Sequence, residues 1–512
     1  MSNYPSFCNP RFVLYLTFIN IAVADNVLLI IADDLGRDSL GIYNDEASAS
    51  VPPTPTIDSL AASGIQFNRA YAYPTCSPTR SSILTGRHHF RTGVHSPSIN
   101  ELQPNEFTLA EAILESGQIG NRLAHFGKWH LGGGNDGPNV NGGWPHYAGS
   151  TSGGVSDYYS WTKVVNGVST RNYSVYATTD VVNDAIAWID EQGEADWFAW
   201  VAFNAPHTPF HKPDNSLHDY DHLDGSDSDI SNNSRPYYEA MIQAMDTEIG
   251  RLLAHVDLAE TTVIFMGDNG TPGRVAQAPF GRGHTKGSLY EGGVNVPFIV
   301  AGAGVDSGLA GIVSEELVHS VDLYLTILDL LGIDLSGLLP NGLVYDSLSF
   351  FPYLNGSADA HVRDYTYSGS YDSGEGERNL MLVNDAYKWI QFADGTEELY
   401  ALSDGLSETN NRINGLDSEE MASLAKFEIE RDVLVNLPQI VGTFLSQDGA
   451  FTIETGWFAD ANLSVEHCSD LLTGDWSLVD SVSVIDIGEA TVELVFDIDS
   501  ESQQFFRVGH TP

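Results

Sequence analysis

The stretch NVLLIIADD, residues Asn26–Asp34, decides the fold class. After Asn26 its residues are apolar up to Ala32, without the alternation of a half-buried strand. Such runs are typical of strands buried on both faces of a mostly parallel sheet. The run ends in two carboxylates, and open α/β sheets bind ligands beyond the carboxyl ends of their strands. The other strands, and the polar residues that follow them, are therefore the first guide to function.

Four further runs of this kind are predicted strands, namely Arg122–Phe126, Trp197–Phe203, Thr261–Met266 and Val296–Ala301. Helical stretches are predicted between them, namely Pro55–Ser63, Thr108–Ser116, Thr179–Gln192, Pro236–Val256 and Val321–Leu331. This alternation predicts an α/β fold with a large mixed, mostly parallel sheet flanked by helices.

Changes in composition divide the chain into four predicted segments. Residues 1–24 form a secretory signal peptide, because an apolar run too short to span a membrane ends in the cleavage-type sequence Ala22-Val23-Ala24. Residues 25–340 hold the large domain, 341–437 a smaller α+β subdomain, and 440–512 an accessory β-sandwich-like module. No later segment is apolar enough to anchor the chain, so we expect a secreted or periplasmic protein. The module is expected to bind carbohydrate, to attach to a cell surface or only to stabilise the chain.

The composition excludes some classes of partner. The chain has 69 acidic and 23 basic residues, a formal net charge of −46, which argues against nucleic acid as a partner. A hydrophobic content of 42% is that of a globular protein, and the acidic surface fits salty or marine water. Removal of the signal takes Cys8 with it, and Cys76 and Cys468 remain far apart in sequence, so no disulfide framework is expected.

Two pairs of residues with oxygen-bearing side chains, three carboxylates and one amide, indicate a metal site at predicted strand ends. Asp33 and Asp34 follow the first strand, and Asp268 and Asn269 follow the strand Thr261–Met266. These oxygen ligands suit Ca²⁺ or Mg²⁺ better than zinc. Turns and helix caps also use Asp and Asn, but carboxylates that meet at one sheet edge need a cation between them.

Basic residues follow other strands or lie in glycine-rich loops. Lys128 and His130 follow the second strand, and His207 follows the third. Lys286 lies in Gly281–Gly287, and only six lysines occur in the whole chain. Their placement beside the predicted metal site indicates an oxyanion pocket.

The stretch Cys76-Ser-Pro-Thr-Arg80-Ser-Ser-Ile-Leu-Thr-Gly-Arg87 carries the reactive group. A lone cysteine can be buried filler, a thiolate nucleophile or the precursor of an aldehyde. The stretch resembles the Cys-x-Pro-x-Arg and Leu-Thr-Gly-Arg motifs of the formylglycine-dependent (type I, arylsulfatase-like) sulfatases of the alkaline phosphatase superfamily. The resemblance extends from about Asn26 to Asn411.

The resemblance implies a sulfuric ester hydrolase whose cysteine is oxidised to Cα-formylglycine by a maturation enzyme. Asp33, Asp34, Asp268 and Asn269, with modified Cys76, would hold one calcium ion. Arg80 would hold the formylglycine, and Lys128 and Lys286 would bind sulfate oxygens. His130 would assist the aldehyde hydrate, and His207 would protonate the leaving group. One hydroxyl of the hydrate attacks sulfur, and loss of the second hydroxyl's proton expels sulfate; a serine would stay trapped as its sulfate ester.

Substrate choice is less constrained by the sequence. A sulfated carbohydrate is expected, a marine polysaccharide or its oligosaccharides, with subsite residues predicted at His211, Arg282, His284, Tyr159 and Trp161. Two alternatives stay open, a phosphonate monoester or phosphodiester hydrolase of the same superfamily and a non-catalytic glycan-binding protein. Asn295 stands where many family members carry Arg, which we expect to be a local structural substitution.

Overall fold

The computed structural model describes residues 26–436, apart from 45–48, 336, 341–342, 358–361 and 372–377, and then the strands between 440 and 510. The predicted signal peptide lies outside the described residues. Within the described part of the chain, no helix is both long and apolar enough to cross a membrane.

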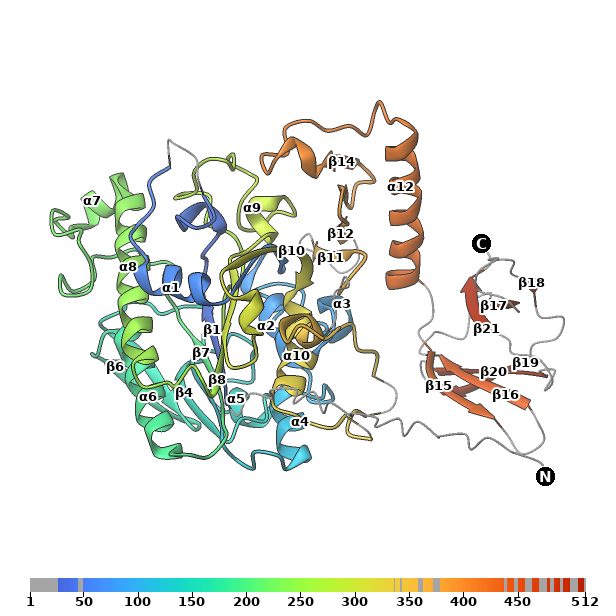
Figure 1. Cartoon of the computed structure of the whole chain (residues 1–512), viewed down its shortest axis with the longest axis horizontal. Coiled ribbons are helices and arrows are strands. Elements are labelled where there is room, and N and C mark those ends of the chain that lie inside the picture. Colours follow the sequence, from blue (N-terminus) through green and yellow to red (C-terminus); the bar gives the residue numbers. More distant parts are fainter. Residues whose placement is uncertain are drawn as a thin grey trace, which may run out of the picture.

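A ten-stranded sheet organises the large domain (Figure 1), in the order β10-β2-β9-β8-β1-β7-β3-β4-β5-β6. The strands are β1 (Asn26–Ala32), β2 (Ile65–Tyr71), β3 (Leu123–Lys128), β4 (His146–Ser150), β5 (Trp161–Val165), β6 (Val168–Tyr173), β7 (Phe198–Ala202), β8 (Thr261–Gly267), β9 (Phe298–Gly302) and β10 (Ile312–His319). The central strands β8, β1, β7, β3 and β4 pair in parallel, whereas β9 runs antiparallel to both of its neighbours. The predicted mixed, mostly parallel sheet is confirmed.

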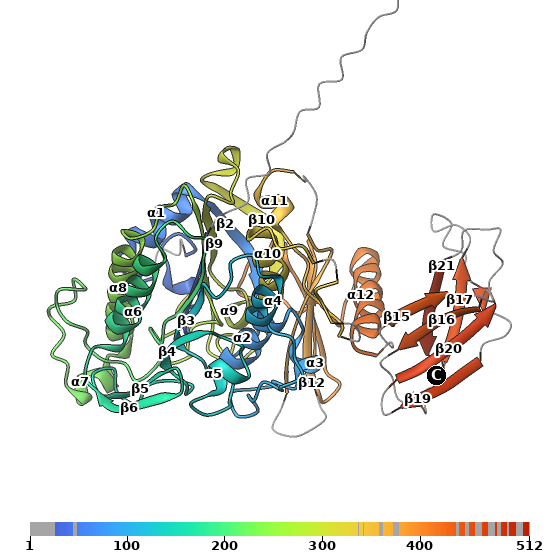
Figure 2. The same cartoon turned by 90° about the horizontal axis from the view of Figure 1, so that it is seen from below.

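Helices cover both faces of this sheet (Figure 2). One face carries α1 (Pro55–Ser63), α6 (Ala177–Gln192) and α8 (Ser234–Leu253), and the other carries α2 (Cys76–Thr85), α4 (Leu109–Ser116) and α10 (Leu323–Leu330). Alternate side chains of β1 enter the two hydrophobic cores, and all six from Val27 to Ala32 are fully buried. This double burial explains the continuous apolar run of the sequence.

The short helices lie in the connections. They are α3 (His89–Thr92), α5 (Gly137–Val140), α7 (Asp227–Asn232), α9 (Glu291–Val294) and α11 (Phe351–Leu354). Of the predicted elements, β1 and α1 have the expected bounds, and the other predicted strands and helices of the large domain differ by a few residues at their ends.

A second, antiparallel sheet contains β11 (Thr366–Tyr371), β12 (Arg378–Val383), β13 (Tyr387–Gln391) and β14 (Glu397–Ala401). Helix α12 (Ser418–Arg431) packs on it, with Phe427 stacked on Trp389 at 6.4 Å between ring centroids. The predicted smaller α+β unit is therefore present, and a π-helical segment, Asp432–Asn436, directly continues α12.

The strands beyond residue 440 form two small sheets. The four-stranded sheet has the order β15-β16-β20-β19 and the three-stranded sheet the order β18-β17-β21. Their bounds are β15 (Ile440–Leu445), β16 (Ala450–Thr455), β17 (Leu463–Cys468), β18 (Ser477–Leu478), β19 (Ser483–Gly488), β20 (Thr491–Asp497) and β21 (Phe505–His510). All of their pairings are antiparallel, in keeping with the predicted all-β module.

Candidate active site

Four neighbouring strands deliver polar residues to one edge of the sheet. The order β8-β1-β7-β3 places the residues after each strand side by side, because all four strands run in the same direction. Asp268 and Asn269 follow β8, and Asp33 and Asp34 follow β1. The loops after β7 and β3 add the predicted histidines.

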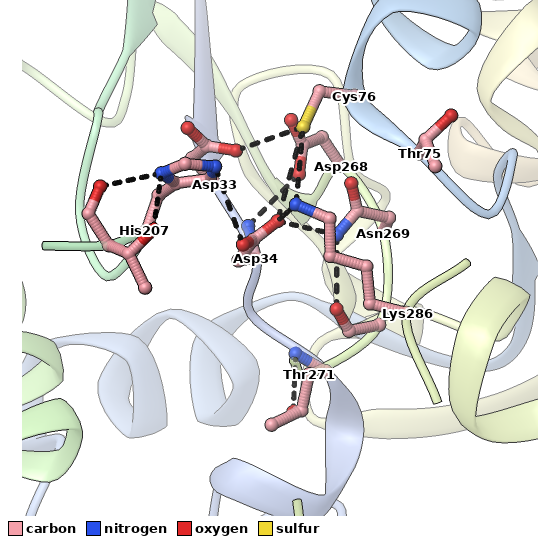
Figure 3. Close-up of polar contacts among 12 residues, drawn as sticks. Asp33, Asp34, Thr75, Cys76, His207, Asp268, Asn269, Thr271 and Lys286 are labelled. Carbon is pink, nitrogen blue, oxygen red and sulfur yellow. Dashed lines mark hydrogen bonds and ion pairs between the residues drawn. The ribbon is translucent and has the colours of Figure 1, made fainter. Parts of the chain in front are cut away.

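Three carboxylates and one sulfur converge at this edge (Figure 3). Asp33, Asp34, Asp268 and Cys76 each place one ligand-type atom within 4.8 Å of the others, and all four residues are buried. Asn269 donates its Nδ2 to Asp34 Oδ1 at 2.9 Å, while its buried Oδ1 has no hydrogen-bond partner in the described part of the chain. An unpartnered carbonyl oxygen beside three carboxylates fits a hard divalent cation.

Three cations accompany the three carboxylates. Lys128 Nζ lies 2.6 Å from Asp33 Oδ2, Arg80 Nη2 lies 2.7 Å from Asp268 Oδ2, and Lys286 Nζ bonds Asp34. Although burial opposes it, these cations, led by Arg80, lower the pKa of Asp268 to about 2. Because the six charges balance, a divalent cation would give the site a net positive charge, which suits a small anion.

Cys76 begins helix α2, whose ten residues are all buried. The sequence of α2 is rich in Ser and Thr, whose hydroxyls bond within the helix or to remote segments: Ser82 Oγ donates to the Thr79 carbonyl at 2.8 Å, and Thr79 Oγ1 donates to the Asp268 carbonyl at 2.8 Å. Gly86 ends the helix in the left-handed conformation. The helix therefore fixes residue 76 against the strand that carries the metal-site residues.

The Cys76 thiol has an environment that disfavours a thiolate. Its Sγ lies 3.3 Å from Asp33 Oδ1, and the residue is 1% exposed. Burial, followed by the charge of Asp268, raises the pKa of this thiol. Of the three interpretations of the cysteine, a free thiolate nucleophile is thus the least supported.

The two histidines flank this centre. His207 Nε2 lies 3.8 Å from Asp34 Oδ2, and its Nδ1 donates to the Thr208 carbonyl at 2.7 Å. His130 is 7% exposed and adopts a positive φ of 61°. Burial, followed by the charge of Lys128, lowers the pKa of His130 to about 2, which keeps its ring neutral, and its buried Nδ1 has no hydrogen-bond partner in the described part of the chain.

Supporting residues that the sequence did not single out hold the metal-site loops. Tyr238 OH donates to the Asp34 carbonyl at 2.7 Å, and Thr271 Oγ1 accepts from Gly36 N at 3.2 Å and donates to Asp38. Tyr238 lies near the start of α8, about 200 residues after Asp34, so its role depends on packing between distant segments. No local pattern in the sequence signals it.

Of the predicted subsite residues, Trp161 does not reach the surface. It is 4% exposed, packs in the core and donates its Nε1 to the Val175 carbonyl at 3.0 Å. Tyr159 is 40% exposed and stacks on Tyr176 at 4.8 Å, and His211 Nε2 lies 3.0 Å from Tyr176 OH. A buried indole cannot contact a substrate, so only the tyrosine and histidine of this loop region remain candidates.

The other two predicted subsite residues lie in the loop that precedes Lys286. Arg282 is exposed, and His284 stacks face to face on Tyr290 at 3.6 Å between ring centroids. Tyr290 OH in turn donates to Glu398 Oε2 of β14 at 2.8 Å. The second sheet therefore supports this side of the site.

Asn295 occupies a structural position, as expected. Its Nδ2 donates to Glu291 Oε2 at 2.7 Å, and its Oδ1 accepts from Arg37 Nη1 at 3.0 Å. Arg37, three residues after Asp34, thus brings a guanidinium from a remote segment into contact with Asn295.

Comparison with known proteins agrees with this fold and identifies the family. The family model described as Sulfatase matches residues 25–333, more than half of the chain. Mouse (Mus musculus) arylsulfatase J is 27% identical over 60% of this chain and 52% of its own length, so the chain spans about half of that relative. Cattle (Bos taurus) arylsulfatase A is 29% identical over 68% of this chain and 71% of its own length.

Solved structures show the same fold. Ps i-CgsB in complex with k-i-k-neocarrahexaose matches with a TM-score of 0.65 and 22% identity, covering 79% of this chain and 92% of that one. BT4656 in complex with its substrate D-glucosamine-2-N,6-O-disulfate matches with a TM-score of 0.64 and 18% identity, covering 80% and 98%. The chain belongs to the sulfatase family, sulfuric ester hydrolases of the alkaline phosphatase superfamily, which confirms the resemblance seen in its motifs.

Proposed function

We propose that this protein removes sulfate from a sulfated carbohydrate, with Cα-formylglycine at position 76 and one calcium ion. The observation that carries the proposal is the convergence of Asp33, Asp34 and Asp268, each paired with a cation, on the Cys76 sulfur at the start of α2. Sulfuryl transfer spreads negative charge over the oxygens around sulfur, and such a centre stabilises that charge.

One group of residues would hold the calcium ion. Asp33, Asp34, Asp268 and the Asn269 Oδ1 atom would hold calcium, which supplies positive charge next to residue 76. Arg80 stays bonded to Asp268 and to the Lys128 carbonyl, so it orients both sides of the pocket. The three carboxylates would then face the metal ion.

The cations and histidines act on the substrate. Lys128 and Lys286 bind sulfate oxygens, Lys286 from a side chain that is 20% exposed. His207 donates a proton to the alcohol oxygen as the S–O bond to the leaving group breaks. We assign to His130 the proton that is released as sulfate leaves the enzyme, because the buried Nδ1 of its ring has no hydrogen-bond partner in the described part of the chain.

A carbohydrate substrate is supported by the surroundings of the site. Tyr159 presents a ring that is 40% exposed, and His211 lies against it. Arg282 and the stacked His284 lie near Lys286, where they can meet a carboxylate or hydroxyl. Two of the structural neighbours were solved in complex with an oligosaccharide and with a sulfated sugar. The acidic composition favours a marine polysaccharide or its oligosaccharides, met by a secreted or periplasmic enzyme.

The test is sulfate release from a panel of defined sulfated oligosaccharides, aryl sulfates and aryl phosphodiesters. Protein from a host that has a formylglycine-generating enzyme should release sulfate, and Cys76→Ser should release at most one equivalent. Mass spectrometry of the Cys76 peptide should show replacement of sulfur by oxygen with loss of two hydrogens. Chelation should abolish turnover, and calcium should restore it.

Other results would redirect the assignment. A preference of several orders of magnitude for phosphodiesters or phosphonate monoesters would favour the alternative hydrolase. Binding of a sulfated glycan without release of sulfate by the modified protein would favour a glycan-binding role.

A further inference from the structure

The β4–β5 loop (residues 151–160) lies against both histidines of the site. It joins strand β4, the neighbour of β3 in the sheet, to strand β5. It carries the consecutive glycines Gly153 and Gly154. A Cβ atom at Gly153 would lie 2.6 Å from His130 Cε1 and 3.0 Å from its Cδ2. At Gly154 it would lie 3.2 Å from His207 Nδ1 and 3.3 Å from its Cε1. Two bare backbone positions therefore lie against the two rings.

The same loop also holds the backbone of His207. Tyr158 is 1% exposed, and its hydroxyl lies 2.6 Å from the Asn204 carbonyl and 2.8 Å from the His207 carbonyl. The Tyr158 carbonyl accepts from Ala177 N at 2.9 Å, which ties the loop to α6. The loop thus contacts both the ring and the backbone of His207.

We propose that the β4–β5 loop positions the two proton-transferring histidines, with Gly153 serving His130 and with Gly154 and Tyr158 serving His207. Neither glycine has a positive φ, so an alanine fits the backbone at both places and only the histidine ring has to move. The inference rests on the proposed function, because it assigns the two rings to different steps.

The two steps give the variants different kinetic signatures. Breaking the S–O bond needs His207 most when the departing alcohol is a weak acid, since a good leaving group departs without a proton. Release of sulfate involves His130 and is the same for every substrate, because the alcohol has already gone. Displacement of His207 should therefore lower kcat/KM most for substrates with poor leaving groups. Displacement of His130 should lower kcat by the same factor for every substrate.

The experiment compares 4-nitrophenyl sulfate with phenyl sulfate, whose leaving group is poorer. For Gly154→Ala and Tyr158→Phe, kcat/KM should fall about tenfold more on phenyl sulfate than on 4-nitrophenyl sulfate. For Gly153→Ala, kcat should fall by about tenfold or more on both esters, with kcat/KM changed less than about threefold. Gly415→Ala is the control, because that exposed glycine has no atom within 4 Å of an added Cβ, and it should match the wild type.

A crystal structure of Gly153→Ala with unmodified Cys76 provides a readout besides turnover. The His130 ring should be displaced from its wild-type position, and an unmoved ring would overturn the inference. Equal losses in kcat and kcat/KM on both esters for the loop variants would also overturn it, since they indicate a structural role only. Failure of the modified wild-type protein to release sulfate from any ester is a separate result, and it would reject the proposed function itself.

Discussion

Two buried clusters of carboxylates and cations differ in what their oxygens face. In the site cluster, the oxygens of Asp33, Asp34 and Asp268 face one another within 4.8 Å, and the side chain of Lys286 beside them is 20% exposed. In the second cluster, here called the Lys388 cluster, Glu291 and Glu408 face the single ammonium of Lys388 at 3.0 and 2.9 Å.

The Lys388 cluster is closed to solvent. Its three side chains are 0–2% exposed, and Glu291 also accepts hydrogen bonds from Tyr71 OH and Asn295 Nδ2. It ties β13 of the small sheet to α9 of the large domain. The two clusters have the same residue types, so the direction of the oxygens and access to solvent distinguish a candidate ion site from a structural ion pair.

The largest expected effect comes from Asp34→Asn in the site cluster. Loss of one carboxylate that faces the others should lower kcat/KM by at least about 10³-fold and remove the rise in Tm that calcium produces. Steady-state kinetics and thermal unfolding with and without calcium measure both. Glu194→Gln, which changes an exposed carboxylate outside both clusters, should do neither. If activity stays within about tenfold of wild type, Asp34 has a structural role like that of Glu291 and does not take part in the reaction.

Lys388→Met should affect stability instead. Removing the one cation shared by two buried carboxylates should lower the free energy of unfolding by about 3–5 kcal/mol. Denaturant unfolding measures this, with Lys426→Met, at an exposed position on α12, as the matched control. Activity of the folded fraction at low temperature should stay within a few-fold of wild type. An unchanged stability with lost turnover would assign the Lys388 cluster to catalysis and break the comparison.

Glu408 should give the second cluster a pH dependence. Burial, opposed by Lys388 and reinforced by Glu291, raises the pKa of Glu408 to about 7. Its folded form stays protonated where the unfolded chain ionises, so its stabilising contribution is complete below about pH 4.5 and is lost as the pH rises to about 7. Relative to Glu408→Gln, the wild type should lose about 1–3 kcal/mol of stability across that range. Parallel stability curves for the two proteins would contradict this assignment.

The smallest effect concerns the surface outside both clusters. With a net charge of −46, the exterior should repel a polyanionic substrate at low ionic strength. Activity on a sulfated polymer should therefore rise as salt increases to marine strength, with a smaller change for 4-nitrophenyl sulfate. A steady fall in polymer hydrolysis from low salt upward would show that the local positive charge of the site outweighs the acidic exterior.

The sequence predicted that Asp33 and Asp34 would lie beside Asp268 and Asn269 because each pair directly follows its own strand. The apolar runs before Asp33 and Asp268 identified strands β1 and β8, and these are neighbours in the sheet. Helix α2 was not predicted, since its Ser- and Thr-rich sequence has weak helix propensity and burial compensates for it. Strand β2 was not predicted either, because polar residues interrupt its middle. Its pairing with β9 and β10, which are remote in sequence, stabilises it in the fold.

Contacts between remote segments were also beyond the sequence. Trp161 has the residue type of a sugar platform, but its orientation into the core depends on the packing of β5 against Tyr173. Lys388 did leave a signal, because it interrupts an apolar strand in a chain with six lysines. That signal indicates a buried partner without saying which carboxylates supply it.

The burial of helix α2 would limit the time available for the proposed oxidation of Cys76. About 190 residues separate Cys76 from Asp268, which follows strand β8 and whose backbone and side chain bond to residues of α2 in the finished fold. At the usual rate of about 5–20 residues per second, a ribosome needs roughly 10–40 s to make that stretch. The proposed oxidation requires another enzyme to reach a residue that ends 1% exposed. Synthesis rate and supply of the maturation enzyme should therefore set the fraction of molecules that can become active.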